Sequence, residues 1–182
     1  MTNRPPLIAV CGASSATAQE MRDAEEVGRL LAERGAVVVC GGLGGVMEGV
    51  ARGVRAAGGT SIGLLPGDDA EQANSDIAIA VPTGMGEMRN LLIARSCSGM
   101  IAVGGGYGTL GEIAHALRLG RRVAALRTWA IRAPGESAAP PDLCLVETAR
   151  DAVNAVLGGG SVSSGAPVPP RDAPRPPSSR RR

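Results

Sequence analysis

The chain contains almost no aromatic residues and no lysine. Its 182 residues include one tyrosine, one tryptophan and no phenylalanine, while hydrophobic residues make up 44%. A core must therefore consist of Val, Ile, Leu, Ala and Met, and the length suits one globular domain. All 19 basic residues are arginine. The absence of lysine excludes a P-loop phosphate site and any enzyme that holds pyridoxal phosphate as a Schiff base.

Histidine, long apolar runs and paired cysteines are scarce as well. His115 is the single histidine, which excludes metal sites built from several histidines, and we interpret it as structural. The four cysteines lack CxxC spacing, so we expect reduced and mostly buried thiols and no metal site. No apolar run reaches the ~20 residues that span a bilayer, and the first residues do not resemble a signal peptide. We therefore expect a cytoplasmic protein without membrane contact.

The charge is unevenly distributed along the chain. The net charge is +2, yet the segment 158–182 alone holds five arginines and one aspartate. The preceding part is therefore slightly acidic, which argues against nucleic-acid binding, because nucleic-acid-binding proteins carry a basic face. The same segment consists mostly of Gly, Ser, Pro and Arg. We expect it to be a disordered tail after a single folded domain at 1–157.

Short apolar segments alternate with segments of helical periodicity. The apolar segments are continuous, which is typical of strands in a parallel sheet that helices cover on both faces. The sequence therefore predicts an α/β fold, a three-layer, doubly wound, Rossmann-like parallel sheet with right-handed crossovers. The expected strands are 6–12, 36–42, 60–67, 76–84, 99–106, 121–126 and 143–147, and the expected helices are 17–35, 44–59, 87–97, 109–120 and 148–157.

Glycine-rich turns follow four of the expected strands. They are CGASSA after the first strand, CGGLGGVM after the second, PTGMGEMRN after the fourth and GGGYGT after the fifth. Ligands of open parallel sheets bind at the carboxyl ends of the strands. Glycine lets backbone N–H groups approach a ligand closely, and helix N-termini favour anions. We therefore expect a phosphate site at this edge, although CGASSA after the first strand does not complete GxGxxG and the chain has no Walker motif.

The segment GGGYGTLGE at 104–112 has two interpretations. Thr109 and Glu112 have the S/T-x-x-E spacing of a capping box, which would only begin a helix. A capping box does not need the preceding glycines, whereas a backbone cradle for a phosphate does. Arg89 falls in the first turns of the preceding helix, where a cation is unfavourable unless an anion or carboxylate lies opposite it. The alternative for Arg89 is a solvated surface arginine.

A resemblance to a known family rests on 83–123, TGMGEMRNLLIARSCSGMIAVGGGYGTLGEIAHALRLGRRV. This segment resembles the signature of the LOG-like Rossmann superfamily, which has a PGGxGTxxE motif and an upstream arginine. The resemblance extends over roughly 6–157. The superfamily includes the Lonely Guy phosphoribohydrolases that activate cytokinins, proteins once labelled lysine decarboxylases, and molybdenum cofactor carrier proteins. The decarboxylase label is excluded here, because the chain has no lysine for a Schiff base.

The resemblance implies a site and two departures from the family pattern. Arg89 and Glu112 match the catalytic pair, while Gly104 replaces the leading proline and Asn90 replaces the lysine of the hydrolases' Arg-Lys pair. Both departures favour the carrier-like branch. The residues expected to contact the ligand are Gly12, Ser14, Gly42, Gly45, Asn90, Gly105, Gly106, Gly108 and Thr109.

Three hypotheses for the function remain open at this point. The first is binding, without turnover, of a phosphorylated ligand such as a nucleotide or the pterin phosphate of molybdenum cofactor. The second is hydrolysis of the N-glycosidic bond of a nucleoside 5′-monophosphate by Glu112 and Arg89. The third is a sensing or structural role in which Glu112 only caps a helix. We expect no required cofactor, and the family habit predicts a homodimer or higher homo-oligomer.

Overall fold

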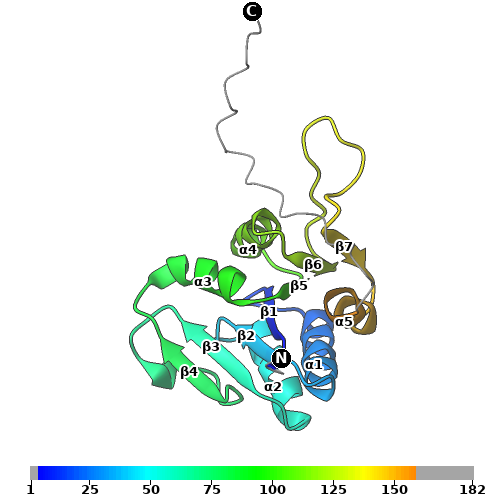
Figure 1. Cartoon of the computed structure of the whole chain (residues 1–182). Helices are drawn as coiled ribbons and strands as arrows, with labels where there is room; N and C mark the ends of the chain where they lie inside the picture. Colours follow the sequence, from blue (N-terminus) through cyan, green and yellow to red (C-terminus); the bar gives the residue numbers. More distant parts are fainter. Residues whose placement is uncertain (1–3, 159–182) are drawn as a thin grey trace, which may run out of the picture.

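A computed structural model describes residues 4–158, which form one seven-stranded parallel sheet (Figure 1). The strand order is β4-β3-β2-β1-β5-β6-β7, and every neighbouring pair is parallel. The expected α/β, doubly wound, Rossmann-like sheet is therefore confirmed. The expected disordered tail lies, apart from Gly158, outside the described residues. The strands are β1 (Leu7–Gly12), β2 (Val37–Cys40), β3 (Ser61–Leu65), β4 (Ile79–Pro82), β5 (Gly99–Val103), β6 (Arg122–Leu126) and β7 (Leu143–Val146).

Helices cover both faces of the sheet. One face packs against α1, α2 and α5, and the other against α3 and α4 (Figure 1). Within residues 4–158, no helix is both long and apolar enough to cross a bilayer. The helices are α1 (Ala18–Glu33), α2 (Val46–Ala56), α3 (Arg89–Ser96), α4 (Tyr107–Arg118) and α5 (Ala149–Leu157), with short 3-10 helices η1 (Ala70–Gln72) and η2 (Gly86–Met88).

The chain reverses its direction of travel across the sheet between β1 and β5. From β1 it proceeds outward through β2 and β3 to β4, and α3 then returns it to β5 on the other side of β1. The register places Gly12 beside Val103, so the carboxyl ends of β1 and β5 meet. In doubly wound sheets this switch point is where ligands bind, because the loops on its two sides run in opposite directions.

The core is built from aliphatic side chains on both faces of the central strands. All five residues of β5 are buried, and β1 buries its four central residues. Ile8 and Val10 face the α1–α2 layer, whereas Ala9 and Cys11 face the α3–α4 layer. A strand buried on both faces has no polar side, which explains the continuous apolar runs in the sequence.

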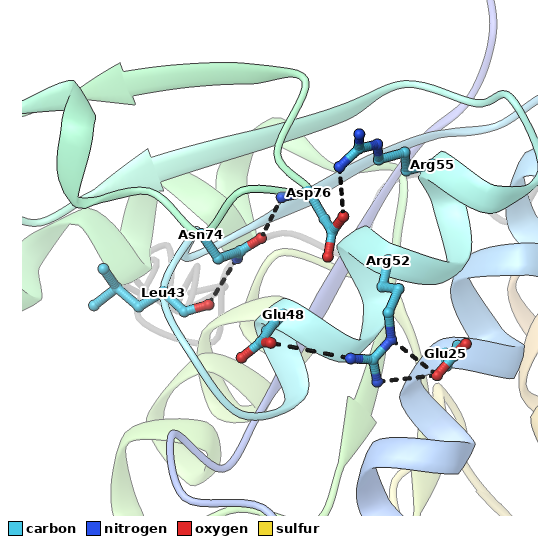
Figure 2. Close-up of polar contacts among 7 residues, drawn as sticks. All are labelled: Glu25, Leu43, Glu48, Arg52, Arg55, Asn74 and Asp76. Atoms are coloured by element: carbon cyan, nitrogen blue, oxygen red, sulfur yellow. Dashed lines mark hydrogen bonds and ion pairs between the residues drawn. The ribbon is translucent and has the colours of Figure 1, made fainter.

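Ion pairs and a hydrogen-bonded turn hold α2 in place (Figure 2). Arg52 of α2 pairs with Glu25 of α1 at 3.0 Å, and Arg55 pairs with Asp76 at 2.9 Å. The side-chain amide of Asn74 donates to the Leu43 carbonyl at 2.8 Å. These contacts turn the chain before β4, so β4 begins at Ile79 and the expected strand 76–84 is too long at both ends.

The α1–α2 contact depends on glycine at position 53. A Cβ on Gly53 would collide with the Glu25 carbonyl oxygen and lie 2.8 Å from its carbon. Gly53→Ala is therefore expected to lower the free energy of unfolding by about 1–3 kcal/mol, because overpacking outweighs the gain in helix propensity. Urea unfolding measures this loss. Gly111→Ala in α4 is the control, since a Cβ there meets nothing within 4 Å; equal effects of both substitutions would contradict the prediction.

Candidate anion-binding site

The turns after β1 and β2 pack directly against each other at the carboxyl edge of the sheet. The Val46 amide, the first of α2, donates to the Ala13 carbonyl at 2.9 Å. A Cβ on Gly12 would lie 2.7 Å from Val46 Cγ1, and one on Gly45 would lie 2.6 Å from the Ser14 carbonyl. The close contacts of Gly12 and Gly45 are thus with the protein itself. Ser14 is exposed on the same edge.

The second expected glycine of the β2 turn also has a packing partner. Gly42 has a φ of +74°, and a Cβ there would lie 2.8 Å from Leu65 Cδ2. Its carbonyl accepts hydrogen bonds from the backbone and side-chain amides of Asn74 at 2.9 and 3.1 Å. The adjacent Gly41, which sequence reasoning missed, instead faces Arg89. The sequence feature that could have identified Gly41 is its position as the first glycine after β2.

The turn after β5 leads into α4 without a capping box, so the capping-box interpretation of Thr109 and Glu112 is wrong. Gly104 and Gly105 have φ values of +55° and +96°, and they turn the chain so that Gly106 is the N-cap. Thr109 is therefore the third residue of the helix, and it is 3% exposed. No side chain of the described residues caps this N-terminus. The α4 amides are left for another acceptor.

Space is open beside the first turn of α4. A Cβ on Gly106 or Gly108 would meet nothing within 4 Å, whereas one on Gly105 would collide with the Thr109 hydroxyl. The uncapped N-terminus carries the positive end of the helix dipole. This turn has the backbone donors, the open space and the positive electrostatic potential that an anion requires.

Arg89 is buried although it is the first residue of α3. Only 8% of it is exposed, and its guanidinium packs so closely on Gly41 that a Cβ there would collide with it. Its Nε has no hydrogen-bond partner within residues 4–158. Burial lowers the pKa of Arg89, and the Glu112 carboxylate opposes that shift. The interpretation as a solvated surface arginine is wrong. Asn90, the next residue, is half-buried.

Glu112 of α4 is the buried acid that faces this arginine. It is 7% exposed, and burial raises its pKa to about 7, while Arg89 and a hydrogen bond from the Cys11 thiol act in the opposite direction. Burial and the neighbouring Glu112 raise the pKa of Cys11 well above its usual range. Within the described residues, no ion pair of 4 Å or less joins Arg89 to an acidic side chain. A buried cation without a direct counter-ion is costly unless a ligand supplies the anion.

The chain's only two aromatic residues meet at the same turn. Tyr107, the first residue of α4, is 83% exposed, and its ring centroid lies 5.7 Å from that of Trp129. The Trp129 indole donates to the Gly106 carbonyl at 3.0 Å, which ties the loop after β6 to the α4 N-terminus. Sequence reasoning placed Trp129 in a surface loop and missed this pairing. The sequence feature that could have drawn attention to this pair is the scarcity of aromatic residues in the chain.

The single histidine contacts its own helix, and most of the thiols are buried. His115 Nδ1 lies 3.3 Å from the Gly111 carbonyl on its own helix. All four cysteines are free, and three of them are buried, as expected. In the part of the chain that the structure describes, no group of three or more His, Cys, Asp or Glu side chains is placed to hold a metal ion.

Comparisons with known sequences identify relatives over most of the chain. A protein of Archaeoglobus fulgidus described as uncharacterized is 45% identical over 120 residues, which is 66% of this chain and 79% of that protein. A rice protein described as a probable cytokinin riboside 5′-monophosphate phosphoribohydrolase is 34% identical over 111 residues. That match covers 59% of this chain and 49% of the rice protein, so the chain spans about half the length of this relative.

Solved structures share the fold. The molybdenum cofactor binding protein of Rippkaea orientalis has a TM-score of 0.68 at 36% identity, over 70% of this chain and 79% of its own. The molybdenum cofactor carrier protein of Chlamydomonas reinhardtii has a TM-score of 0.65 at 36% identity, over 69% and 79%. DNA processing protein A of Streptococcus pneumoniae, at 19% identity and a TM-score of 0.61, shows the fold alone. Residues 5–153 match the SLOG cluster4 family, and the LOG-like resemblance is thereby confirmed: the chain belongs to the SLOG cluster4 family.

Proposed function

We propose that this protein binds a phosphorylated small molecule, a nucleotide or the pterin phosphate of molybdenum cofactor, where the turns after β1, β2 and β5 meet. One observation carries the proposal: Arg89 is 8% exposed, lacks an ion pair within the described residues and leaves its Nε unpartnered. A phosphate group supplies both the negative charge and the acceptor oxygens that this guanidinium lacks.

The phosphate would also meet the N-terminus of α4. Gly105, Gly106 and Gly108 bring backbone N–H groups to this turn, and no side chain of the described residues caps it. Arg89 and the helix N-terminus would then hold the phosphate from two elements, as a charged side chain and a helix dipole do in many phosphate sites. This arrangement needs no lysine and no metal ion.

The rest of the ligand would be a planar ring. Tyr107 and Trp129 lie beside Gly106, and an exposed aromatic ring next to a phosphate site favours stacking on a base or pterin. The solved relatives that bind or carry molybdenum cofactor support the pterin, and the rice relative supports the nucleoside monophosphate.

A second candidate function is hydrolysis of a nucleoside 5′-monophosphate to free base and ribose 5-phosphate. The observation that favours it is the pKa of Glu112, which burial raises to about 7 beside Arg89. A carboxyl with this pKa exchanges its proton near neutral pH, as a general acid or base must. Glu112 would accept the proton of a water that attacks the anomeric carbon, and Arg89 would hold the phosphate. Asn90, in the place of the hydrolases' lysine, favours binding alone.

One titration tests both functions. Trp129, as the single tryptophan, reports binding by its fluorescence, and chromatography of the same samples detects released adenine. AMP is expected to bind about tenfold more tightly than ribose 5-phosphate, since base stacking contributes roughly 1–3 kcal/mol. Tyr107→Ala should remove that advantage and Tyr107→Phe should keep it, with calorimetry as a second readout.

Three outcomes decide between the proposals. Binding of AMP and isopentenyladenosine monophosphate without release of a free base from either one supports the binding protein and removes the hydrolase. The hydrolase is supported by release of adenine from AMP, or of isopentenyladenine from isopentenyladenosine monophosphate, provided that Glu112→Gln abolishes the release. If AMP, inorganic phosphate and molybdenum cofactor all leave the fluorescence, the calorimetric heat and the melting temperature unchanged, the proposed site is wrong.

A further inference from the structure

Arginines without an ion pair gather at the edge of the sheet where the strands begin. All neighbouring strands are parallel, so they begin at one edge, here called the amino edge, and the helices return the chain to it. The candidate anion-binding site lies at the opposite edge. Six arginines stand at a helix end or a strand start of the amino edge, and none of them forms an ion pair within residues 4–158: Arg4, Arg34, Arg95, Arg118, Arg121 and Arg122.

Contacts between neighbouring elements bring these arginines onto one surface. The register places Arg122, the first residue of β6, beside Gly99, the first residue of β5. Burial raises the pKa of the Cys97 thiol at the end of α3, and the positive charge of Arg121 opposes this rise, so Arg121 lies close to that end. Arg4 precedes β1, the strand on the other side of β5. The arginines therefore follow the starts of three adjacent strands.

The same surface continues to the end of the last helix. The Arg34 guanidinium, at the end of α1, donates to the side-chain oxygen of Asn154 in α5 at 2.9 Å. The Gly158 amide donates to the Asn154 carbonyl at 2.6 Å, so α5 ends beside Arg34. The segment 158–182, which holds five further arginines and one aspartate, thus begins at the amino edge.

Acidic side chains at the amino edge do not balance this charge. Within residues 4–158, the acidic residues at a helix end or just before a strand of this edge are Glu33, Asp76 and Asp142. Glu33 already pairs with Arg29 of its own helix. Asp76 already pairs with Arg55 at 2.9 Å. Asp142 is left as a single carboxylate among six guanidinium groups, so the amino edge is strongly positive.

The helix dipole accounts for only half of these arginines. Arg34, Arg95 and Arg118 stand at helix C-termini, where a cation is favourable. The other three belong to no helix, and the Nε of Arg121 is buried without a hydrogen-bond partner within the described residues. Like charges gathered in one place repel each other and destabilise the folded chain. An anionic partner would offset this repulsion.

We propose that the amino edge binds an acidic segment of another protein, one rich in aspartate and glutamate. Guanidinium groups pair with carboxylates through two parallel hydrogen bonds, which gives such contacts direction as well as charge. The arginines of 158–182 add to the positive charge that the acidic segment meets. Because the amino edge lies at the far end of the strands from the candidate anion-binding site, this interaction does not depend on the proposed function.

Two features favour an acidic polypeptide over a nucleic acid. The chain's two aromatic residues, Tyr107 and Trp129, pair beside the start of α4, so the amino edge has no ring on which a base could stack. The helices also end at this edge, and their last carbonyl groups carry the negative end of the helix dipole. These carbonyls repel phosphate groups, whereas they accept hydrogen bonds from the N–H groups of a polypeptide.

Fluorescence anisotropy of a labelled oligoglutamate peptide, titrated with the full chain, tests this surface. The peptide is expected to bind, and added salt should weaken the binding, because salt screens exposed ion pairs. The variant that combines Arg95→Gln and Arg118→Gln should bind about tenfold more weakly, since each exposed ion pair contributes modestly. Both side chains are exposed, so the variant should keep its fold.

The matched control combines Arg22→Gln and Arg150→Gln. These arginines are exposed in the first halves of α1 and α5 and form no ion pair within residues 4–158, so the control loses the same charge away from the amino edge. It should bind the peptide like the wild type. Arg89→Met should do so too, and a loss of binding there would place the peptide at the candidate anion-binding site and overturn the proposal.

Three further results would contradict an acidic protein partner. The first is a wild type that does not bind the peptide. The second is an equal loss of affinity in the amino-edge variant and its matched control, which would show that net charge alone attracts the peptide. The third is tighter binding of a short duplex RNA with the same label, which would make the partner a nucleic acid.

Discussion

The variant Arg89→Met is expected to bind AMP at least ~30-fold more weakly than the wild type while it remains folded. Truncating one partner of a buried, hydrogen-bonded charge pair typically costs about 2–5 kcal/mol of binding free energy. Without ligand, the same variant should be at least as heat-stable as the wild type. Burial lowers the pKa of Arg89 and its Nε lacks a partner, so the buried cation costs stability that methionine does not.

The combination of weaker binding and unchanged or higher stability distinguishes a ligand-binding arginine from a structural one. Calorimetry with AMP and thermal unfolding without it supply the two readouts. Arg118→Met is the control, because Arg118 is exposed at the end of α4, and its affinity and melting temperature should stay at wild-type values. Loss of stability together with unchanged affinity would show that Arg89 serves the fold and that the proposed site is elsewhere.

The sequence was sufficient to predict the layers of the fold but not the order of the strands. Continuous apolar runs such as LIAVC and VVVC indicate strands buried on both faces, and the periodic segments between them indicate covering helices. Which strand lies at the centre depends on whether each crossover turns toward one edge or the other. That choice depends on how the helices pack against the sheet and against each other, which the local apolar and helical patterns do not specify.

The candidate site was likewise predicted from the sequence only in part. The resemblance to the LOG-like superfamily identified Arg89 and Glu112 as a pair, and both are buried at the carboxyl edge of the sheet. The capping-box interpretation is wrong because Gly104 and Gly105 adopt left-handed conformations that shift the start of α4 to Tyr107. Dihedral angles of this kind are available to glycine but are not encoded by the S/T-x-x-E spacing.

Glycine at position 104 is not evidence for the carrier-like branch. It stands where the family motif has proline, and on that ground it favoured the carrier-like branch. Its φ is +55°, whereas proline is confined to about −65°, and Glu20 of α1 occupies the position of a Cβ. Glu20 is there because it completes the capping box of α1 with Thr17. Backbone geometry alone therefore accounts for glycine at this position.

The second large effect is a pH-dependent loss of stability caused by Glu112. Burial raises its pKa from 4.5 to about 7, so between these values the folded protein keeps a proton that the unfolded chain releases. Raising the pH through this window therefore favours unfolding. From the size of the pKa difference, the wild type should lose about 3 kcal/mol of unfolding free energy as the pH rises through this window. Glu112→Gln should not show this loss.

Urea unfolding at a series of pH values between 4.5 and 8 measures this difference, with Glu136→Gln, an exposed residue in the loop after β6, as the control that should follow the wild type. Arg89 lowers the pKa of Glu112. Arg89→Met should therefore extend the pH range over which stability falls to higher pH, and it should increase the loss of unfolding free energy. A phosphate bound to Arg89 would also raise the pKa of Glu112, since it offsets the positive charge that lowers this pKa. If Glu112→Gln and the wild type lose stability in parallel, Glu112 is ionised in the folded protein throughout, and its role as a proton-exchanging group near neutral pH is contradicted.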